Sequence, residues 1–233
     1  MTEDDKISVE RPRDAILSRV IHTWLAHEMT VRVTAKSRLT VRPDGRGAWI
    51  FANHLSFLDA HVIEKAVWES GLMNDVWACA GPKVHDGFRA AFADSVNIIQ
   101  VPQPVSVTGS RDLRGMARHA QESIRTARAK VEAGGLVIVF PEGTRTRTGQ
   151  MNDWHKGVAR YLKAGDWIIP TYLKGTEVLG GCVGGQEYAE FADARGSKAL
   201  AEVTFMAPVE VQGTSSGNWV GLETAREAVV QAM

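Results

Sequence analysis

The sequence has few cysteines and no long apolar run. Only two of its 233 residues are cysteine, Cys79 and Cys182, and their spacing matches no metal-binding motif, so we expect both to be reduced side chains in the core. No stretch approaches the roughly 20 consecutive apolar residues that a membrane-crossing helix needs. The opening residues MTEDDKISVE are acidic and lack the basic-then-apolar layout of a signal peptide. These absences favour a cytoplasmic protein.

Net charge is lacking as well. Lys plus Arg and Asp plus Glu number 27 each, so the formal net charge is zero and we expect no nucleic-acid partner. Hydrophobic residues make up 44% of the chain and charged residues 23%, which is typical of a globular protein rather than a disordered one. The length suits one ordinary domain with a sizeable core.

Short apolar runs alternate with amphipathic stretches, which predicts an α/β fold with a mixed, largely parallel sheet wrapped by helices. The predicted strands are Trp49–Ala52, Val76–Ala80, Asn97–Val101, Leu136–Phe140, Trp167–Leu173 and Glu202–Met206. The predicted helices are Phe57–Ser70, Asp86–Asp94, Arg111–Ala133, His155–Ala164 and residues 219–233. Gly134 and Gly135 should end the third of these helices. We expect the glycine-rich residues 176–198 to form a loop.

The first forty residues are predicted to be an amphipathic helical segment, 1–40, ahead of a main domain over 41–233. Between Pro12 and Met29, apolar residues recur near helical spacing, namely Ile16, Val20, Ile21, Trp24, Leu25 and Met29. One interpretation is a helix docked on the core. The other is an interfacial helix that lies on a membrane, with Trp24 and the neighbouring arginines at headgroup level. The sequence alone does not separate the two.

The stretch NHLSFLDA, residues 53–60, directly follows an apolar run. Ser56 and Asp59 form an S-x-x-D capping pattern, which predicts the start of a helix. His54 would then lie in the loop before that helix, from which its ring could fold back against the Asp59 carboxylate. A carboxylate that accepts from one ring nitrogen fixes the tautomer and raises the basicity of the other. The stretch is therefore a helix start, a base with its orienting partner, or both.

A second motif, GGLVIVFPEGTRTRTG at residues 134–149, is a buried type of strand that ends at Pro141. Gly143 would allow the backbone to approach a ligand closely. Arg145 and Arg147 present forked donors that suit a phosphate or a carboxylate. The alternative is a solvated turn whose charges face water.

Together the two motifs resemble the PlsC-like family of glycerolipid acyltransferases, in which N-H-x4-D after one strand is followed by F-P-E-G-T-R after a later one. The resemblance covers roughly residues 48–211. GPK with Lys83 and the following NIIQVP are similar to the second block of the family, and HKGVARYLKAGDWIIPTYLKGT is similar to the fourth. The resemblance implies the glycerol-phosphate acyltransferase-like fold and O-acyl transfer.

The resemblance also implies roles for individual residues. His54 would be the general base that takes the proton of the acceptor hydroxyl, and Asp59 would orient it. The residues implied to bind the acceptor are Lys83, Glu142, Gly143, Thr144 and Arg145, with Arg145 on the phosphate. Asn53 would hold the loop or polarise the thioester, and Pro170 would line the acyl or acceptor channel.

The implied co-substrate is acyl-CoA or acyl-carrier protein, with no cofactor and no metal. The leading acceptor is 1-acyl-sn-glycerol 3-phosphate, which would yield phosphatidate at the inner face of the membrane. One position departs from the family pattern, because the second block usually ends in an arginine where this chain has Pro102 or Gln103. Two alternatives therefore stay open. The acceptor could instead be a lyso-aminolipid, a glycolipid or glycerol 3-phosphate, or the chain could be a non-catalytic lipid- or acyl-binding protein.

Overall fold

The computed structural model describes residues 9–34, 39, 42–72, 75–85, 89–102, 113–148, 150–178, 182–183, 186–187, 199–213 and 219–233. Its main feature is a nine-stranded sheet with the order β1-β5-β4-β6-β3-β7-β10-β2, to which β11 adds beside β7. The strands are β1 (Glu10–Arg11), β2 (Met29–Thr34), β3 (Ala48–Ala52), β4 (Val76–Ala80), β5 (Asn97–Gln100), β6 (Leu136–Val139), β7 (Trp167–Lys174), β10 (Ala199–Phe205) and β11 (Val209–Glu210).

The described helices connect these strands and cover the sheet. The α-helices are α1 (Ala15–Glu28), α2 (Asp59–Glu69), α3 (Arg89–Ala93), α4 (Leu113–Glu132) and α5 (Leu222–Ala232). The short 3₁₀ helices are η3 (Pro82–His85), η4 (Lys156–Tyr161) and η5 (Thr176–Val178). Two small antiparallel pairs lie outside the main sheet, β8 (Cys182–Val183) with β9 (Gln186–Glu187), and β12 (Gln212–Gly213) with β13 (Trp219–Val220).

The strand directions confirm the expected mixed, largely parallel α/β sheet. Neighbours from β5 through β4, β6 and β3 to β7 are all parallel, whereas β1 is antiparallel to β5 and both β10 and β11 are antiparallel to β7. The carboxyl ends of the parallel strands therefore meet at one edge of the sheet, where sites of α/β proteins gather.

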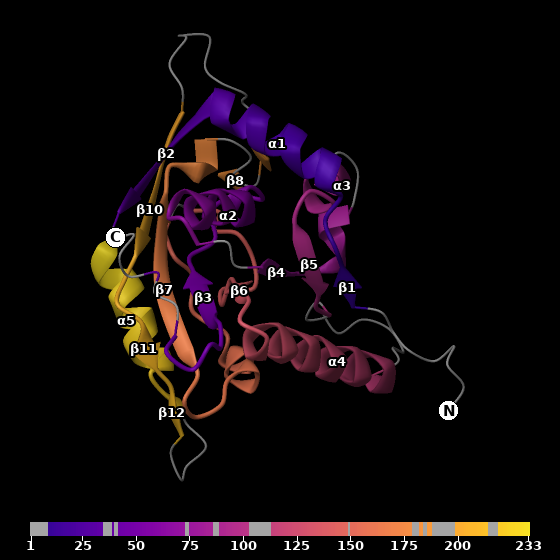
Figure 1. The fold of residues 1–233 in the computed structure, drawn as a ribbon, viewed down its shortest axis with the longest axis vertical. Helices are drawn as coiled ribbons and strands as arrows, with labels where there is room; N and C mark the ends of the chain where they lie inside the picture. Colours follow the sequence, from indigo (N-terminus) through magenta and orange to yellow (C-terminus); the bar gives the residue numbers. More distant parts are fainter. Residues whose placement is uncertain are drawn as a thin grey trace.

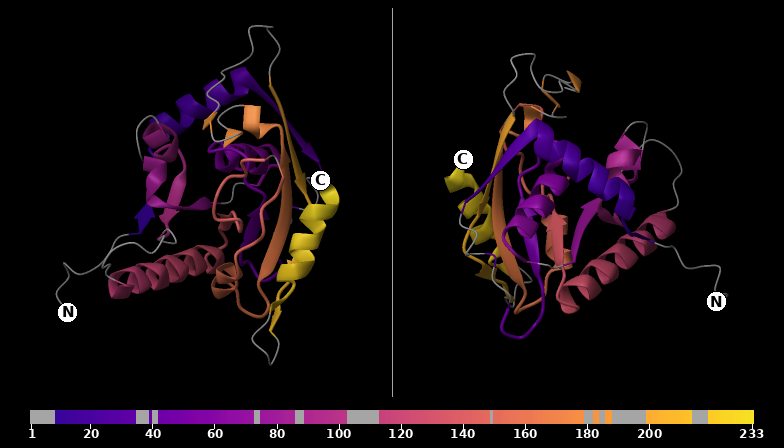
Figure 2. Two further views of the ribbon diagram at one scale, coloured as in Figure 1. Left: turned by 180° about the vertical axis from the view of Figure 1, so that it is seen from behind. Right: turned by 45° about the horizontal axis from the view of Figure 1, so that its top comes forward.

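The core lies on both faces of the sheet, because side chains alternate along each strand. In β3, Ile50 packs with residues of α1 and α2, such as Leu25 and Val62. Trp49 packs on the opposite side with residues of α4, η4 and α5, such as Val131. Helices thus cover the sheet on both faces, and α5 lies along the β7 and β10 side in every view (Figures 1 and 2).

The helix α1 links the two edge strands of the main sheet, since it follows β1 and leads directly into β2. In Figure 1 it runs across the top of the molecule, from α3 and β1 to β2. Its buried side chains Ile21 and Leu25 confirm that this helix docks on the core. Ile16 and Val20, in contrast, are 77% and 56% exposed. The sheet includes β1 and β2, so it extends across the predicted boundary at residue 40.

Several predicted elements need correction or limits. The helix predicted over residues 219–233 begins only at Leu222, after β13, and residues 86–88 of the helix predicted over Asp86–Asp94 lie outside the described residues. The helix predicted over His155–Ala164 is instead the 3₁₀ helix η4, six residues long. The predicted loop at 176–198 contains η5 and the short pair β8 and β9, and its other residues lie outside the described part of the chain. The glycine end of α4 is confirmed, since Gly134 has φ of 92° and Gly135 N–H donates to Lys130 O at 2.9 Å.

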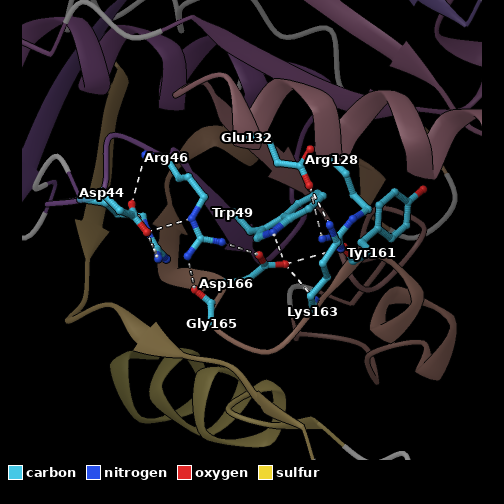
Figure 3. Close-up of polar contacts among 10 residues, drawn as sticks. Asp44, Arg46, Trp49, Arg128, Glu132, Tyr161, Lys163, Gly165 and Asp166 are labelled. Carbon is cyan, nitrogen blue, oxygen red and sulfur yellow. Dashed lines mark hydrogen bonds and ion pairs between the residues drawn. The ribbon is translucent and has the colours of Figure 1, made fainter.

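At the amino ends of β3 and β7, the buried Asp166 carboxylate joins three segments (Figure 3). Its Oδ2 accepts from the indole Nε1–H of Trp49 at 3.2 Å and from Lys163 N–H at 2.8 Å. The guanidinium groups of Arg128 and Arg46 lie 3.6 and 3.9 Å from its oxygens. This cluster fixes the two strands at the edge opposite to their carboxyl ends.

Candidate active site

Three adjacent parallel strands direct the predicted site residues to one place. The loop with His54 follows β3, the loop with Glu142 follows β6, and Thr176 comes directly after β7 and Gly175. The sheet order β6-β3-β7 sets these three loops side by side at the carboxyl edge. Residues far apart in the sequence can therefore act on the same group.

His54 and Asp59 meet as the sequence predicts. The distance between Nδ1 of His54 and Oδ2 of Asp59 is 2.9 Å. Asp59 is fully buried, whereas the His54 side chain is 20% exposed and stacks on the Phe140 ring at 4.2 Å between centroids. Because the Asp59 oxygen accepts from Nδ1–H, the other ring nitrogen, Nε2, is left as a proton acceptor. The ring combines a fixed tautomer with partial access for a substrate.

The turn before α2 aims Asp59 at His54. Oδ2 of Asp59 also accepts from the backbone N–H groups of Leu55 at 2.7 Å and Ser56 at 2.9 Å. The helix start predicted there is confirmed, but the assigned N-cap is Leu58, which makes no side-chain capping bond, rather than Ser56. Ser56 Oγ accepts instead from Leu58 N–H at 3.1 Å. The same Asp59 oxygen therefore bonds to Ser56 at the start of the helix and to the ring of His54.

Glu142 lies beneath the histidine loop, where it is 1% exposed. Its Oε1 accepts from His54 N–H and its Oε2 from Asn152 N–H, both at 2.7 Å. Burial raises the pKa of Glu142 above its ordinary value, and the hydrogen bonds from Asn152 and His54 oppose that rise. Both carboxylate oxygens are engaged with the backbone, an arrangement that suits holding the loop of His54.

Asn53 and Pro170 are both buried next to this loop. The Asn53 amide donates to Leu173 O at 2.9 Å and accepts from Leu173 N–H at 2.7 Å, so it ties the loop to β7. Pro170 lies within β7, and its carbonyl accepts from Met206 N–H at 2.9 Å, just beyond the end of β10. Proline has no N–H to donate, and Pro170 lies between the parts of β7 that pair with β10 and with β11. No ladder hydrogen bond is therefore lost there, and a proline is tolerated.

The remaining predicted acceptor-binding residues lie around the same edge. Gly143 and Thr144 are exposed, and Arg145 is partly buried on the same loop. Gly143 has φ of 67°, and a Cβ there would lie 2.7 Å from Cδ2 of His155, so no larger residue fits without a shift. Lys83 lies in η3, directly after β4, and its side chain is outside the part of the chain that the structure describes.

Sequence reasoning missed two residues that contact the pair directly or through its loop. Thr176 is fully buried, and its hydroxyl donates to Oδ1 of Asp59 at 2.6 Å. Thr146 donates its backbone N–H to the carbonyl of His54 at 2.8 Å. The only local signal for either residue was its place just after a motif or a strand.

Among the described residues, no group of three or more histidine, cysteine, aspartate or glutamate side chains could hold a metal ion. Desolvation raises the pKa of the Cys79 thiol to about 12, and this partly buried side chain packs against the core cluster that contains Trp49 and Val137. Cys182 lies in β8, and its side chain is outside the described part. No described helix combines the length and the apolar character needed to cross a membrane.

Comparison with known proteins places the chain in a family. The family model described as Acyltransferase matches residues 30–174, which is more than half of the chain. The chain belongs to the acyltransferase family. The matched range includes His54, Asp59 and the loop after β6, and Thr176 lies just beyond it.

A solved structure supports the fold. The 1-acyl-sn-glycerophosphate (LPA) acyltransferase PlsC from Thermotoga maritima superposes with a TM-score of 0.53 at 19% sequence identity, over 94% of this chain and 76% of that one. At that identity the likeness establishes the fold alone. Among curated proteins, none matches the chain. The protein is thus an acyltransferase enzyme with a PlsC-like fold.

Proposed function

We propose that this acyltransferase moves a fatty acyl group from acyl-CoA or acyl-carrier protein to the hydroxyl of a lysophospholipid. The first acceptor to test is 1-acyl-sn-glycerol 3-phosphate, with phosphatidate as product. The observation that supports the proposal is the hydrogen bond of 2.9 Å between His54 and the buried Asp59 at the carboxyl edge of the sheet. That pair has the form of a general base with its orienting partner.

The proposed reaction is one direct transfer without a cofactor. The acceptor hydroxyl oxygen attacks the thioester carbonyl carbon, a C–O bond forms, and the C–S bond breaks. Nε2 of His54 takes the hydroxyl proton and delivers it to the departing thiolate, so the histidine returns to its starting state. Asp59 holds the ring and stabilises the imidazolium that forms in between. No acyl-enzyme is needed, because the acceptor oxygen attacks the thioester directly.

The acceptor-binding roles follow from the family resemblance and from position. Arg145 and Lys83 would bind the acceptor phosphate, with Gly143 and Thr144 lining the approach. These two cations would replace the arginine that the second block lacks at Pro102. A forked guanidinium suits a phosphate monoester better than an uncharged headgroup.

Membrane association is a further part of the proposal. Ile16 and Val20 are exposed one helical turn apart on α1, with the exposed Arg19 between them. We infer that these two aliphatic side chains would enter the membrane interface, with Arg19 beside anionic headgroups. A lysophospholipid acceptor would reach the site from that surface, on the inner face of the membrane.

An acyl-transfer assay tests the proposal. Purified protein is given radiolabelled acyl-CoA, and separately acyl-carrier protein, with lysophosphatidate, glycerol 3-phosphate, a lyso-aminolipid and a glycolipid. We expect product from lysophosphatidate, and loss of at least about a hundredfold in kcat for His54→Ala, since general-base catalysis is worth 10²–10⁴-fold. The exposed His27 provides the matched control, and His27→Ala should retain activity.

The other outcomes are informative. Product from an uncharged acceptor alone would mean that the change at Pro102 marks a changed substrate. Binding of lysolipid without transfer from either donor would favour a lipid-binding protein. A fully active His54→Ala variant would refute the mechanism.

A further inference from the structure

The Asp59 carboxylate is held from two directions. One oxygen, Oδ2, accepts from the ring of His54 and from the N–H groups of Leu55 and Ser56, all within the same turn. The other oxygen, Oδ1, accepts from the hydroxyl of Thr176 at 2.6 Å, which comes from the far side of β7 in the sequence. A buried carboxylate oxygen without a donor costs free energy, so this second contact is needed where Asp59 lies.

The position of Thr176 is built into the fold. Gly175 precedes it with φ of 83°, and a Cβ at that glycine would lie 2.0 Å from the carbonyl oxygen of Leu200, so only glycine allows the turn. Thr176 itself is fully buried. As a β-branched residue it has few allowed rotamers, which restricts the direction of its hydroxyl.

A second contact joins the same two segments. Asn53, at the start of the histidine loop, bonds to both backbone groups of Leu173 in β7. The histidine loop, residues 53–59, is therefore bonded to the end of β7 through Asn53 and to the following Thr176 through Asp59. Rotation of the carboxylate about its χ2 angle would break the Thr176 contact and move Oδ2 away from Nδ1 of His54.

We propose that Thr176 is a positioning residue of the acyl-transfer site, whose hydroxyl holds the Asp59 carboxylate in the orientation that receives the Nδ1–H of His54. The proposal rests on the proposed function for its effect on turnover, but the contact itself can be tested without turnover. Thr176 touches neither substrate nor the reacting atoms. Its effect on catalysis passes through Asp59 to the tautomer and direction of the imidazole.

The test uses a matched set of variants. Thr176→Val replaces the hydroxyl by a methyl group of nearly the same size, and Thr176→Ser keeps the hydroxyl. Thr171→Val is the control, because Thr171 is also fully buried on β7 but donates to Ile169 O at 3.2 Å rather than to the pair. Thermal unfolding first establishes that each variant folds, and Thr176→Ala replaces the valine variant if that one does not.

The first readout is the proton NMR signal of the Nδ1–H of His54, identified by its loss in His54→Ala. It reports the contact with Asp59 whether or not a substrate is turned over. We expect the signal to persist in Thr176→Ser and Thr171→Val and to be lost or clearly shifted in Thr176→Val. An unchanged signal in Thr176→Val would overturn the proposal.

The second readout is steady-state kinetics with the acceptor that the wild type uses. A hydrogen bond to a charged group contributes a substantial free energy, and we expect its loss to raise the barrier of the transfer step. Thr176→Val should therefore lower kcat roughly 10- to 100-fold, with KM nearly unchanged. Thr176→Ser should recover most of the loss. In a His54→Ala background Thr176→Val should cost nothing more, since residues that act as a unit are not additive.

The two readouts separate the possible failures. Equal losses from Thr176→Val with and without His54 would mean a structural role and would overturn the positioning proposal. A wild type without acyl transfer to any acceptor would overturn the proposed function, and the NMR signal would then decide the Thr176 contact by itself.

Discussion

His61 makes the stability of the protein depend on pH. It lies on α2, two residues beyond Asp59, and is 2% exposed. Its Nε2 contacts Phe92 O at 2.9 Å and Ser95 Oγ at 2.7 Å. Burial, helped by the charge of the neighbouring His22, lowers the pKa of His61 from 6.5 to about 3. The folded protein therefore keeps this ring neutral where the unfolded chain protonates it.

The direction and size of the effect follow from that difference. Between the folded and unfolded pKa values the unfolded chain binds more protons, so stability falls as the pH drops below 6.5 and the loss is complete near pH 3. One pKa unit corresponds to about 1.4 kcal/mol, so at about pH 5 His61 alone should lower the free energy of unfolding by about 2 kcal/mol relative to neutral pH.

Denaturant unfolding of the wild type and of His61→Gln at about pH 7 and pH 5 isolates this contribution. The glutamine amide can donate to Phe92 O but does not titrate, so the variant should lose about 2 kcal/mol less than the wild type between the two pH values. His27→Gln, at an exposed position, should behave as the wild type. Equal losses in the wild type and His61→Gln would refute the reasoning.

Two further changes test the site and the surface. In Glu142→Gln an amide N–H2 group faces the backbone N–H of either His54 or Asn152, so one of the two hydrogen bonds is lost. In steady-state kinetics kcat should fall by about tenfold or more, with little change in the KM for the acceptor. A raised KM with unchanged kcat would instead mean that Glu142 binds the acceptor. Ile16→Ser combined with Val20→Ser should weaken co-sedimentation with anionic phospholipid vesicles by roughly tenfold or more, since each exposed aliphatic side chain would otherwise be buried in lipid. Equal vesicle binding by the double variant and the wild type would mean that α1 does not bind the membrane.

Much of the sheet follows from periodicity in the sequence. The central strands read as continuous apolar runs because they are buried on both faces, and Val76–Ala80 was predicted with its observed bounds. The strand β2 was missed although Met29, Val31 and Val33 alternate with polar residues in the period of a strand. The helical pattern just before it led us to treat the whole segment as helical. With two residues, β1 is too short to give any pattern.

The helix predicted at 155–164 failed for a local reason. Gly157 is a poor helix former, and Val158 and Leu162 are the only residues of the stretch that are buried, which gives one short apolar contact rather than a stripe. Two turns of 3₁₀ helix are enough to place Val158 and the Leu162 that follows them. Short segments of this kind are where 3₁₀ helices occur.

The histidine–aspartate pair could be predicted because both residues and the capping pattern lie within one short stretch. The contact between Thr176 and Asp59 could not, since the two residues are 117 apart in the sequence and only the sheet order brings them together. The position of Glu142 shows the same limit. The resemblance implied that Glu142 binds the acceptor, which stays a prediction. It did not imply that both carboxylate oxygens accept from backbone N–H groups, those of His54 and Asn152.

This placement gives a physical reason for the two motifs to occur together. The loop after β6 bonds to His54 on both sides of its peptide backbone, through Glu142 at the N–H and through Thr146 N–H at the carbonyl. The contacts of Asn53 and Asp59 with the end of β7 hold the two ends of the histidine loop, but they do not bond to the backbone of His54 itself. The second motif therefore has a structural task in addition to any contact with the acceptor. Substitutions at Glu142 and Thr176 should then act on the same imidazole from opposite neighbouring strands, and their effects on kcat should combine less than additively.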